Sequence, residues 1–178
     1  MPELHVGERH WSVASGSNLL DALNDAGCHV PYSCRAGSCH ACLVRCVEGE
    51  PLDASPSALS LAQRDAGWRL SCQCRVATVL RIELFDPRRD GQPARVLAAD
   101  WLGGDVLRLR LQPLNGLRYQ VGQHVLLWNA EGVARPYSLA SVPGEDPWLE
   151  FHIDCRQPGA FCSSLRGLLV GDELRLGE

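Results

Sequence analysis

The most informative stretch of this sequence is Cys34-Arg-Ala-Gly-Ser-Cys39-His-Ala-Cys42, which a further cysteine, Cys72, follows after a gap of 29 residues. The pattern is C-x4-C-x2-C with a distant fourth cysteine, one of the spacings that [2Fe–2S] clusters use. Gly37 and Ser38 let the loop wrap a cluster closely and aim backbone N–H groups at its sulfurs. The sequence therefore predicts one [2Fe–2S] cluster held by Cys34, Cys39, Cys42 and Cys72.

The same cysteines could also form other kinds of metal site, or could be free thiols. A structural zinc site typically has two C-x2-C pairs, and here only Cys39 and Cys42 form one cleanly. Cys74 is a second candidate for the distant ligand, although the spacing favours Cys72. A Rieske-type site needs two histidines, whereas the loop holds only His40, which we expect to face solvent. The other cysteines are expected to be buried free thiols: Cys28, Cys46, Cys74, Cys155 and Cys162.

The region around the cysteine loop resembles the plant-type ferredoxin family, a β-grasp fold that carries one [2Fe–2S] cluster. Besides the cysteines, the resemblance rests on Tyr32-Ser33, Val47-Glu-Gly-Glu50 and Gly67-Trp-Arg-Leu-Ser-Cys72-Gln. His40 departs from the small residue, often glycine, that many members have at that position. The resemblance covers about residues 1 to 86 and implies an α+β β-grasp ferredoxin domain.

Periodicity in this region predicts a small mixed sheet with one helix. The segments that read as strands are Arg9 to Val13, Leu43 to Val47 and Val76 to Leu84. Ser17 is the expected N-cap of the helix, which should stop at Gly27. The apolar residues that share one face of this helix are Leu19, Leu20, Leu23 and Ala26.

The chain is expected to divide near residue 90, where Asp86-Pro-Arg-Arg-Asp-Gly-Gln-Pro93 has the polar, proline-bounded composition of a linker. We therefore predict domains at residues 1–90 and 91–178. Six short strands separated by turn residues predict a sandwich or barrel in the second domain, with one helix at 161–169. These strands are Val96 to Ala99, Val106 to Leu111, Gln123 to Trp128, Tyr137 to Ala140, Trp148 to Ile153 and Glu173 to Leu176.

The most informative string of the second domain is Arg135-Pro136-Tyr137-Ser138. An arginine can pair with a phosphate, an aromatic ring can stack on a flat heterocycle, and a hydroxyl can hydrogen-bond a polar edge. On a strand, Arg135 and Tyr137 share one face and Ser138 lies on the other. Taken alone, so short a string fits better an edge strand with an exposed arginine and a half-buried tyrosine, so its context decides.

In context, the string resembles the flavin motif of the ferredoxin–NADP reductase-like flavoproteins. Gly122-Gln123 lies upstream, and Leu149-Glu-Phe-His-Ile153, Gly159-Ala-Phe-Cys162-Ser163 and Val170-Gly-Asp172 follow in that family's order. The resemblance implies an antiparallel six-stranded Greek-key β-barrel that binds FAD, over about residues 94 to 178. The flavin contacts that it implies are Arg135, Pro136, Tyr137, Ser138, His152, Ile153, Gly159, Cys162 and Ser163.

The resemblance also implies a role for each part of the motif. In that family the arginine meets the flavin phosphate, the tyrosine stacks on the isoalloxazine, and the serine reaches its polar edge. A G-x-x-S turn opens a helix toward the pyrophosphate, and Cys162 stands here in place of its serine, with Ser163 beside it. We therefore expect N–H groups at the helix start to hold the anion. No catalytic side chain is predicted.

Composition excludes several classes of protein. Of 178 residues, 46% are hydrophobic and 21% charged, and the net charge is −4, as in ordered globular proteins. All 17 basic residues are arginine, which excludes a phosphate-loop lysine and a lysine Schiff base within this segment. The basic residues are dispersed and no apolar stretch approaches the ~20 residues of a membrane span. We expect no nucleic-acid or membrane partner.

The cysteine count and the N-terminal sequence indicate the cellular compartment of the protein. Nine cysteines, an odd number without a visible secretory signal, favour a metal or cluster site over a disulfide framework. We therefore expect a cytoplasmic protein.

The order of the two domains resembles the reductase components of bacterial multicomponent oxygenases. It implies an NAD(P)H-dependent oxidoreductase in which FAD takes up an electron pair and the [2Fe–2S] cluster passes electrons singly to an oxygenase or other acceptor protein. Such proteins continue into an NAD(P)-binding domain, which we expect downstream of residue 178. Two alternatives stay open: a non-enzymatic electron carrier without a nicotinamide site, and a zinc module on a β-barrel adaptor.

Overall fold

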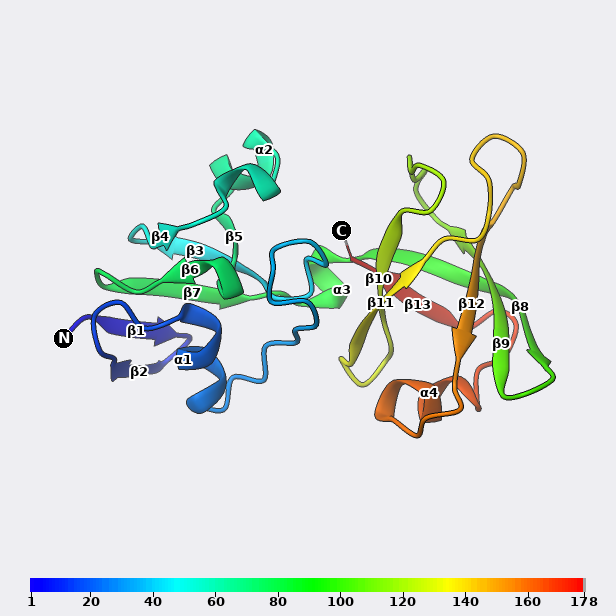
Figure 1. The fold of residues 1–178 in the computed structure, drawn as a ribbon, viewed down its shortest axis with the longest axis horizontal. Helices are drawn as coiled ribbons and strands as arrows, with labels where there is room; N and C mark the ends of the chain where they lie inside the picture. The colour runs from blue at the N-terminus through cyan, green and yellow to red at the C-terminus, as the bar shows by residue number, and fades with distance from the viewer. Residues whose placement is uncertain (178) are drawn as a thin grey trace. The chain divides into compact units, whose positions relative to one another are not determined.

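The structure is a computed structural model that describes residues 1–177. It divides into two compact units, Met1–Phe85 and Asp86–Glu178, a few residues before the position near residue 90 expected from the sequence. Figure 1 follows the chain through both units, and each has its own sheet and its own hydrophobic core.

The first unit contains the strands β1 (Glu3–Val6), β2 (Arg9–Ser12), β3 (Leu43–Glu48), β4 (Leu52–Asp53), β5 (Trp68–Leu70), β6 (Cys74–Arg75) and β7 (Leu80–Leu84). Its helical segments are α1 (Leu19–Asp25), α2 (Leu61–Asp65) and the 3₁₀ turns η1 (Pro56–Ala58) and η2 (Ser71–Gln73). Five strands form a sheet in the order β2-β1-β7-β3-β5, and β4 pairs with β6. β1 and β7 are parallel while their other partners are antiparallel, which confirms the predicted mixed sheet.

The helix α1 forms because its apolar residues fall on one face and that face is buried. Leu19, Leu20 and Leu23 are 0% exposed and belong to one core with Leu4 of β1 and Ile82 of β7. Burying a leucine contributes roughly 1.5–3 kcal/mol, whereas an isolated helix this short does not persist in water. Packing against the sheet therefore determines where α1 lies.

Two details of this unit differ from the predictions. Asn18, and not Ser17, caps α1, because its Oδ1 accepts the N–H of Asp21 at 3.3 Å. The strand predicted from Val76 begins only at Leu80. The reason is that Val76 donates its N–H to the carbonyl of Ser17 at 2.9 Å, which holds it to the loop before α1 and outside the main sheet.

The second unit contains the strands β8 (Gln92–Leu102), β9 (Val106–Pro113), β10 (His124–Trp128), β11 (Ala134–Ser138), β12 (Leu149–Asp154) and β13 (Glu173–Leu176). Its helices are α3 (Pro87–Asp90) and α4 (Ala160–Leu165). The strands form one antiparallel sheet in the order β11-β10-β13-β8-β9-β12. The six predicted strands are therefore present, with shifted ends. Their inward side chains, Val96, Leu109 and Phe151 among them, build the core.

The sheet of the second unit is open between β11 and β12, which are its two edge strands. Within residues 86–177, continuous strand pairing therefore does not produce the closed barrel expected from the sequence. The physical reason lies in the connection between these strands. β11 ends at Ser138 and the backbone turns at 143–145, so it leaves the ladder before β12 begins at Leu149.

The segment predicted as a linker, 86–93, is partly regular. Asp86 caps α3, because its Oδ1 accepts the N–H of Arg88 at 2.9 Å, and Pro87 occupies the first turn. An aspartate cap followed by proline is a helix-start signal. The linker prediction relied on polar composition and did not use this signal. After the C-cap residue Gly91, β8 begins at Gln92.

The helix α4 is shorter than the predicted helix at 161–169. It ends at Leu165, and the N–H of Leu168 then bonds to the carbonyl of Leu165 at 3.2 Å. This bond spans three residues instead of four, so the α-helical ladder tightens and stops. Phe161 and Leu165 are buried and hold the helix to the core.

A capping box in α2 gives a stability test of the first unit. Ser60 Oγ accepts the N–H of Gln63 at 3.3 Å, and Gln63 Oε1 accepts the N–H of Ser60 at 2.7 Å. We expect Ser60→Ala to lower the free energy of unfolding by about 1 kcal/mol. Urea unfolding measures this, with the exposed Ser57→Ala as the control. Equal losses in the two variants would show that the cap contributes nothing.

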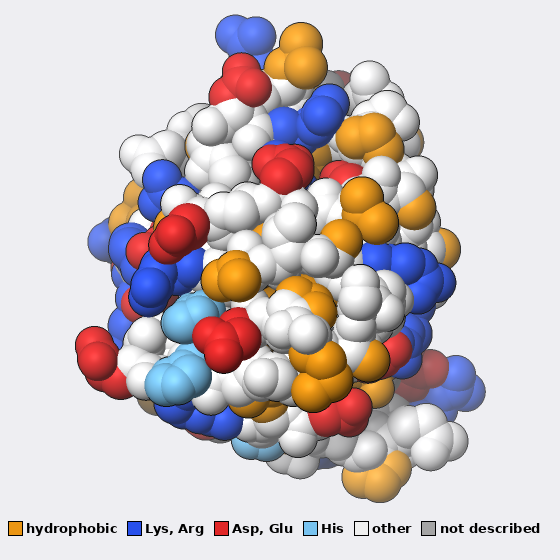
Figure 2. Space-filling model, turned by 90° about the vertical axis from the view of Figure 1, so that its left-hand side faces the viewer, with side chains coloured by type: hydrophobic (Ala, Val, Ile, Leu, Met, Phe, Trp, Pro, Cys, Tyr) orange, Lys and Arg blue, Asp and Glu red, His pale blue; other side chains and the backbone are white. Residues whose placement is uncertain are grey.

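No helix in residues 1–177 is long and apolar enough to cross a bilayer. Figure 2 shows one face of the molecule, on which basic, acidic, histidine and apolar side chains are interspersed. Among the paired residues of β1 and β2, His5 and His10 lie opposite each other and stack, with ring centroids 5.5 Å apart. Glu3 Oε2 lies 3.4 Å from His5 Nε2.

Candidate functional site

The first three predicted cluster ligands lie on an irregular loop before β3, and the fourth lies on η2. Ser71 donates its N–H to the carbonyl of Cys42 at 3.1 Å, and its Oγ bonds the same carbonyl at 2.8 Å. These bonds extend the antiparallel register in which Leu43 pairs with Leu70. The β3–β5 ladder thereby brings Cys72 to Cys42 from far along the chain.

The four cysteines form two pairs. Cys34 and Cys39 each donate the backbone N–H to the sulfur of the other, at 3.5 and 3.4 Å, and the side chains of Cys42 and Cys72 shift each other's pKa. A charge interaction between Cys34 and Cys72 connects the pairs. Cys34 is exposed, and the other three are buried. This donor set fits a [2Fe–2S] cluster, which places four thiolates on two irons.

Hydrogen-bond donors point at these sulfurs. The N–H groups of Ala36 and Cys39 lie 3.3 and 3.4 Å from Cys34 Sγ. Gln73 Nε2 donates to Cys72 Sγ at 3.4 Å. Such donors stabilise negative charge on sulfur, whether the sulfur is a free thiolate or a ligand.

The pKa values of two thiols reflect this environment. Burial raises the pKa of Cys34, but hydrogen bonds from Ser38 and the loop backbone outweigh it and lower the pKa to about 6. The hydrogen bond from Cys42 lowers the pKa of Cys72 to about 6 and raises the pKa of Cys42. Cys34 and Cys72 are therefore favoured in the thiolate form that metal binding needs, whereas Cys42 is not.

Two residues of the loop have left-handed backbone. Gly37 has φ +80°, its N–H donates to Cys72, and a Cβ there would lie 3.2 Å from Gln73 Cγ. Glycine thus permits both the turn and the close approach. His40 has φ +56° and is half-buried, so it is only partly exposed to the solvent that we expected it to face. Glycine adopts this backbone region most readily, which explains why a small residue suits the position.

The remaining cysteines differ in burial. Cys74 is 0% exposed in the core of the first unit, and burial raises its pKa, so the geometry favours Cys72 as the fourth ligand. Cys155 is also buried as predicted, whereas Cys28, Cys46 and Cys162 are only half-buried. Within residues 1–177, no three His, Cys, Asp or Glu side chains are arranged to hold a single metal ion, while a structural zinc ion takes four ligands.

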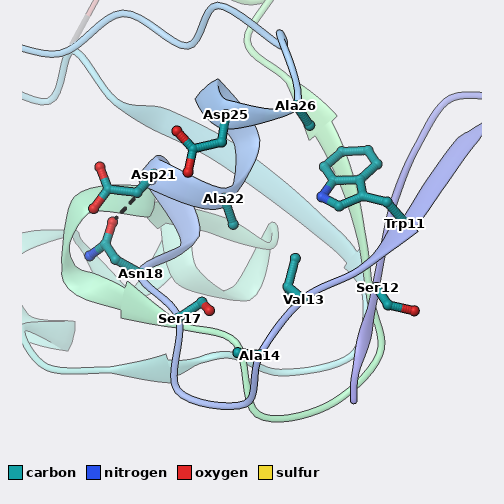
Figure 3. Close-up of a pocket in the computed structure, with 10 residues that line it drawn as sticks. All are labelled: Trp11, Ser12, Val13, Ala14, Ser17, Asn18, Asp21, Ala22, Asp25 and Ala26. Carbon is teal, nitrogen blue, oxygen red and sulfur yellow. Dashed lines mark hydrogen bonds between the residues drawn. The ribbon is translucent and has the colours of Figure 1, made fainter.

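A hollow of about 600 Å³ lies beside α1, between the helix and the end of β2 (Figure 3). Trp11 borders it from β2, and Asp21 and Asp25 project from α1. Asn18, at the start of α1, also lines it and donates from Nδ2 to the carbonyl of Cys72 at 2.9 Å. The sequence analysis missed this link, because the one available signal, the capping preference of asparagine, was assigned to the neighbouring Ser17.

The contact between Asn18 and Cys72 can be tested separately from the cap. We expect Asn18→Asp to keep the cap and lose the Nδ2 donor, which lowers the stability of the cluster-loaded protein by about 1 kcal/mol. Loss of visible absorption during urea unfolding measures this, with Asp25→Asn as the control on the same helix. Unchanged stability in Asn18→Asp would contradict the proposed link.

The predicted flavin motif lies on β11. Arg135 and Tyr137 are two residues apart and share one side of the strand. Arg135 is exposed, while Tyr137 is half-buried, with its ring centroid 5.6 Å from that of Phe161 in α4. Ser138 is exposed and Pro136 is half-buried. The strand thus offers an exposed guanidinium, one nitrogen of which donates to the carbonyl of Ala134 at 2.7 Å, and one partly covered aromatic ring.

Contacts of Tyr137 bring part of α4 to this motif. Its hydroxyl and the thiol of Cys162 are hydrogen-bond partners, and burial raises the pKa of Tyr137. Gly159 is the N-cap residue of α4, and the N–H of Ser163 bonds to its carbonyl at 2.9 Å. The structure therefore brings together two predicted flavin residues, Tyr137 and Cys162, from separate elements.

The two predicted flavin residues on β12 point to opposite faces. Ile153 is 0% exposed in the core of the second unit, so only its backbone is available to a ligand. His152 is exposed, and its Nε2 lies 2.9 Å from Glu150 Oε1. The structure does not bring these two side chains together.

Both units match known families. Residues 5–77 match the family described as 2Fe-2S iron-sulfur cluster binding domain, and residues 98–177 match the family described as oxidoreductase FAD-binding domain. The first unit therefore belongs to the iron-sulfur family and the second to the FAD-binding family. The chain combines the two cofactor domains predicted from its cysteine spacing and its flavin motif.

Several relatives that match most of this chain are named as reductases. The chain is 30% identical over 181 residues to terephthalate 1,2-dioxygenase, reductase component 1, of Comamonas sp, covering 97% of this chain and 54% of that protein. It is 28% identical to CDP-6-deoxy-L-threo-D-glycero-4-hexulose-3-dehydrase reductase of Yersinia pestis, covering 99% and 54%. A solved ferredoxin reductase in carbazole 1,9a-dioxygenase is 28% identical, with a TM-score of 0.50 and coverage of 98% and 59%. The chain spans about half the length of these curated relatives.

Proposed function

We propose that this chain is the electron-transfer part of an NAD(P)H-dependent oxidoreductase that passes electrons through FAD to a [2Fe–2S] cluster and on to an acceptor protein. The observation that carries this function is the set of two cysteine pairs with N–H donors, in the same chain as an FAD-binding domain. FAD takes up electrons in pairs and the cluster passes them on singly, so the two groups together convert hydride to single-electron chemistry.

In the first unit, Cys34 and Cys39 hold one iron, and Cys42 and Cys72 hold the other. The N–H contacts between Cys34 and Cys39 and the mutual effect of Cys42 and Cys72 on their pKa values support this division. Donors to sulfur favour added negative charge and so raise the reduction potential. Plant-type clusters lie near about −400 mV, and we expect this cluster in that region.

In the second unit, Arg135 pairs with the flavin phosphate and Tyr137 packs its ring against the isoalloxazine. The exposed guanidinium and the half-buried ring on one side of β11 support these roles. Cys162 orients Tyr137 through its hydroxyl. The other proposed contacts are Pro136, Ser138, His152, Ile153, Gly159 and Ser163.

The acceptor is proposed to be an oxygenase component or another enzyme that needs single electrons. The names of the two curated relatives support this range, because one is a dioxygenase reductase and the other a dehydrase reductase. NAD(P)H is the proposed donor, bound by an NAD(P)-binding domain expected downstream. The free state of all nine cysteines supports a reducing compartment such as the cytoplasm.

We also propose finer descriptions of the two domains, at residues 1–90 and 91–178. The mixed sheet with α1 packed on it supports a β-grasp fold for the first. For the second domain we propose a six-stranded Greek-key barrel. One backbone hydrogen bond between the two edges of the sheet, near β11 and β12, supports it. The N–H of Ala140, just after β11, donates to the carbonyl of Glu150 in β12 at 2.8 Å.

Anaerobic photoreduction of the chain loaded with both cofactors tests the electron path. Flavin absorbance and the EPR signal of the reduced cluster are followed in the same sample, with the Cys42→Ser variant as a control that lacks an iron ligand. In the native chain we expect the flavin to bleach first and the cluster signal to follow. In Cys42→Ser we expect flavin bleaching without the cluster signal. A fully reduced flavin beside an oxidised cluster would overturn the proposed function.

A further inference from the structure

Two cysteines of the second unit lie next to each other outside the cluster loop. Cys155 directly follows β12 and is 3% exposed. Cys162 lies in the first turn of α4 and is half-buried, with its Sγ 3.8 Å from the carbonyl oxygen of Asp154. Asp154 directly precedes Cys155 in the chain, so the side chain of Cys162 reaches the backbone that carries Cys155.

The two thiols are also neighbours that affect each other's charge: Cys162 contributes to raising the pKa of Cys155, and both cysteines are free. A disulfide needs Cβ atoms close enough for a sulfur–sulfur bond, and the position of Cys162 Sγ against the backbone next to Cys155 makes such a pair reachable. Residues 156–160, which include Pro158 and Gly159, are exposed, and the buried Phe161 follows them before Cys162.

We propose that Cys155 and Cys162 are a modification site that forms a reversible disulfide by exchange with a low-molecular-weight disulfide such as oxidised glutathione. Cys162 loses its proton and attacks one sulfur of glutathione disulfide, which releases one glutathione thiolate and leaves a mixed disulfide. Cys155 then loses its proton and attacks the sulfur of Cys162, which releases the second glutathione. Two protein thiols are oxidised and one glutathione disulfide is reduced to two thiols, so electrons and protons balance.

The surroundings determine which thiol reacts first. Cys162 is the more accessible of the two, and the attacking species in exchange is the thiolate. Burial, followed by the contact with Cys162, raises the pKa of Cys155 to about 12. Cys155 is therefore the resolving cysteine, which acts once the mixed disulfide is held beside it.

This site shares a residue with the proposed flavin contacts, so its link to FAD rests on the proposed function. Cys162 interacts with the hydroxyl of Tyr137 and helps to raise its pKa, so joining Cys162 to Cys155 changes the surroundings of this hydroxyl. Because Cys162 interacts with Tyr137, FAD bound against that ring would stand next to this thiol. Bound FAD is therefore expected to slow the first attack on glutathione disulfide.

Peptide mapping after anaerobic incubation of the cofactor-loaded chain with oxidised glutathione tests the site. After alkylation of free thiols, we expect peptides carrying Cys155 and Cys162 joined with the loss of two hydrogen atoms, and dithiothreitol should reverse this. Cys162→Ser should abolish the cross-link, and Cys28→Ser, which removes another half-buried thiol, should leave it. Cys162 carrying only glutathione beside an alkylated Cys155 would overturn the proposal.

A second arm separates this inference from the flavin assignment. The rate of cross-linking is compared in chain with and without bound FAD, and FAD retention is measured independently by fluorescence after gel filtration. Slower cross-linking with FAD supports the link to Tyr137. Equal rates while FAD stays bound would overturn that link, whereas absence of FAD binding with normal cross-linking would overturn only the proposed flavin function.

Discussion

Cys72→Ser is expected to abolish or strongly change the EPR signal of the reduced cluster, whereas Cys74→Ser should leave it intact. Cys72 meets Cys42 and the N–H of Gly37, so its removal takes away one of four iron ligands. Cys74 is 0% exposed in the core. Its replacement therefore changes packing and not ligation.

Iron content and EPR of the two reconstituted variants are compared at equal protein concentration. Circular dichroism shows whether each variant is folded, because Cys74→Ser places a hydroxyl in an apolar core. A normal EPR signal in Cys72→Ser together with a lost signal in a folded Cys74→Ser would show that Cys74, and not Cys72, is the fourth iron ligand. This result would contradict the proposed ligand set.

Arg135→Ala is expected to weaken FAD binding by tenfold to a hundredfold. A charge-assisted hydrogen bond contributes about 1.5–3 kcal/mol, which corresponds to that range of dissociation constants. The guanidinium is exposed on β11, so its removal should leave the fold unchanged. Fluorescence titration of the apoprotein with FAD measures the affinity.

Arg95→Ala provides the matched control, because Arg95 is an exposed arginine on β8 of the same sheet. It should bind FAD as the native chain does. Equal affinity in Arg135→Ala and Arg95→Ala would show that the predicted motif does not contact the flavin phosphate.

The sequence predicted elements well where several apolar residues repeat with a clear period. The strands β9, β10 and β12 contain such repeats, and the buried face of α1 has three leucines. β1, which the sequence analysis missed, has only Leu4 fully buried. Its strand conformation depends on pairing with β2 and β7, and such non-local pairing is invisible in a short segment.

The candidate site was predictable in composition and less so in arrangement. The cysteine spacing names four ligands, but the pairing of Cys42 with Cys72 depends on the register of Leu43 and Leu70, which spacing alone does not contain. The contact between Tyr137 and Cys162 likewise needs the fold, because it joins an edge strand to a helix. Sequence patterns identify residue types for a cofactor, whereas their mutual contacts come from tertiary packing.

Counting iron, acid-labile sulfide and FAD in one sample of purified, anaerobically reconstituted chain tests most directly whether a single polypeptide carries both redox groups. We predict two irons, two sulfides and one FAD per chain, with the visible spectrum of an iron-sulfur flavoprotein. One zinc ion per chain in place of iron, or a chain that retains iron and sulfide but binds no FAD, would contradict the account.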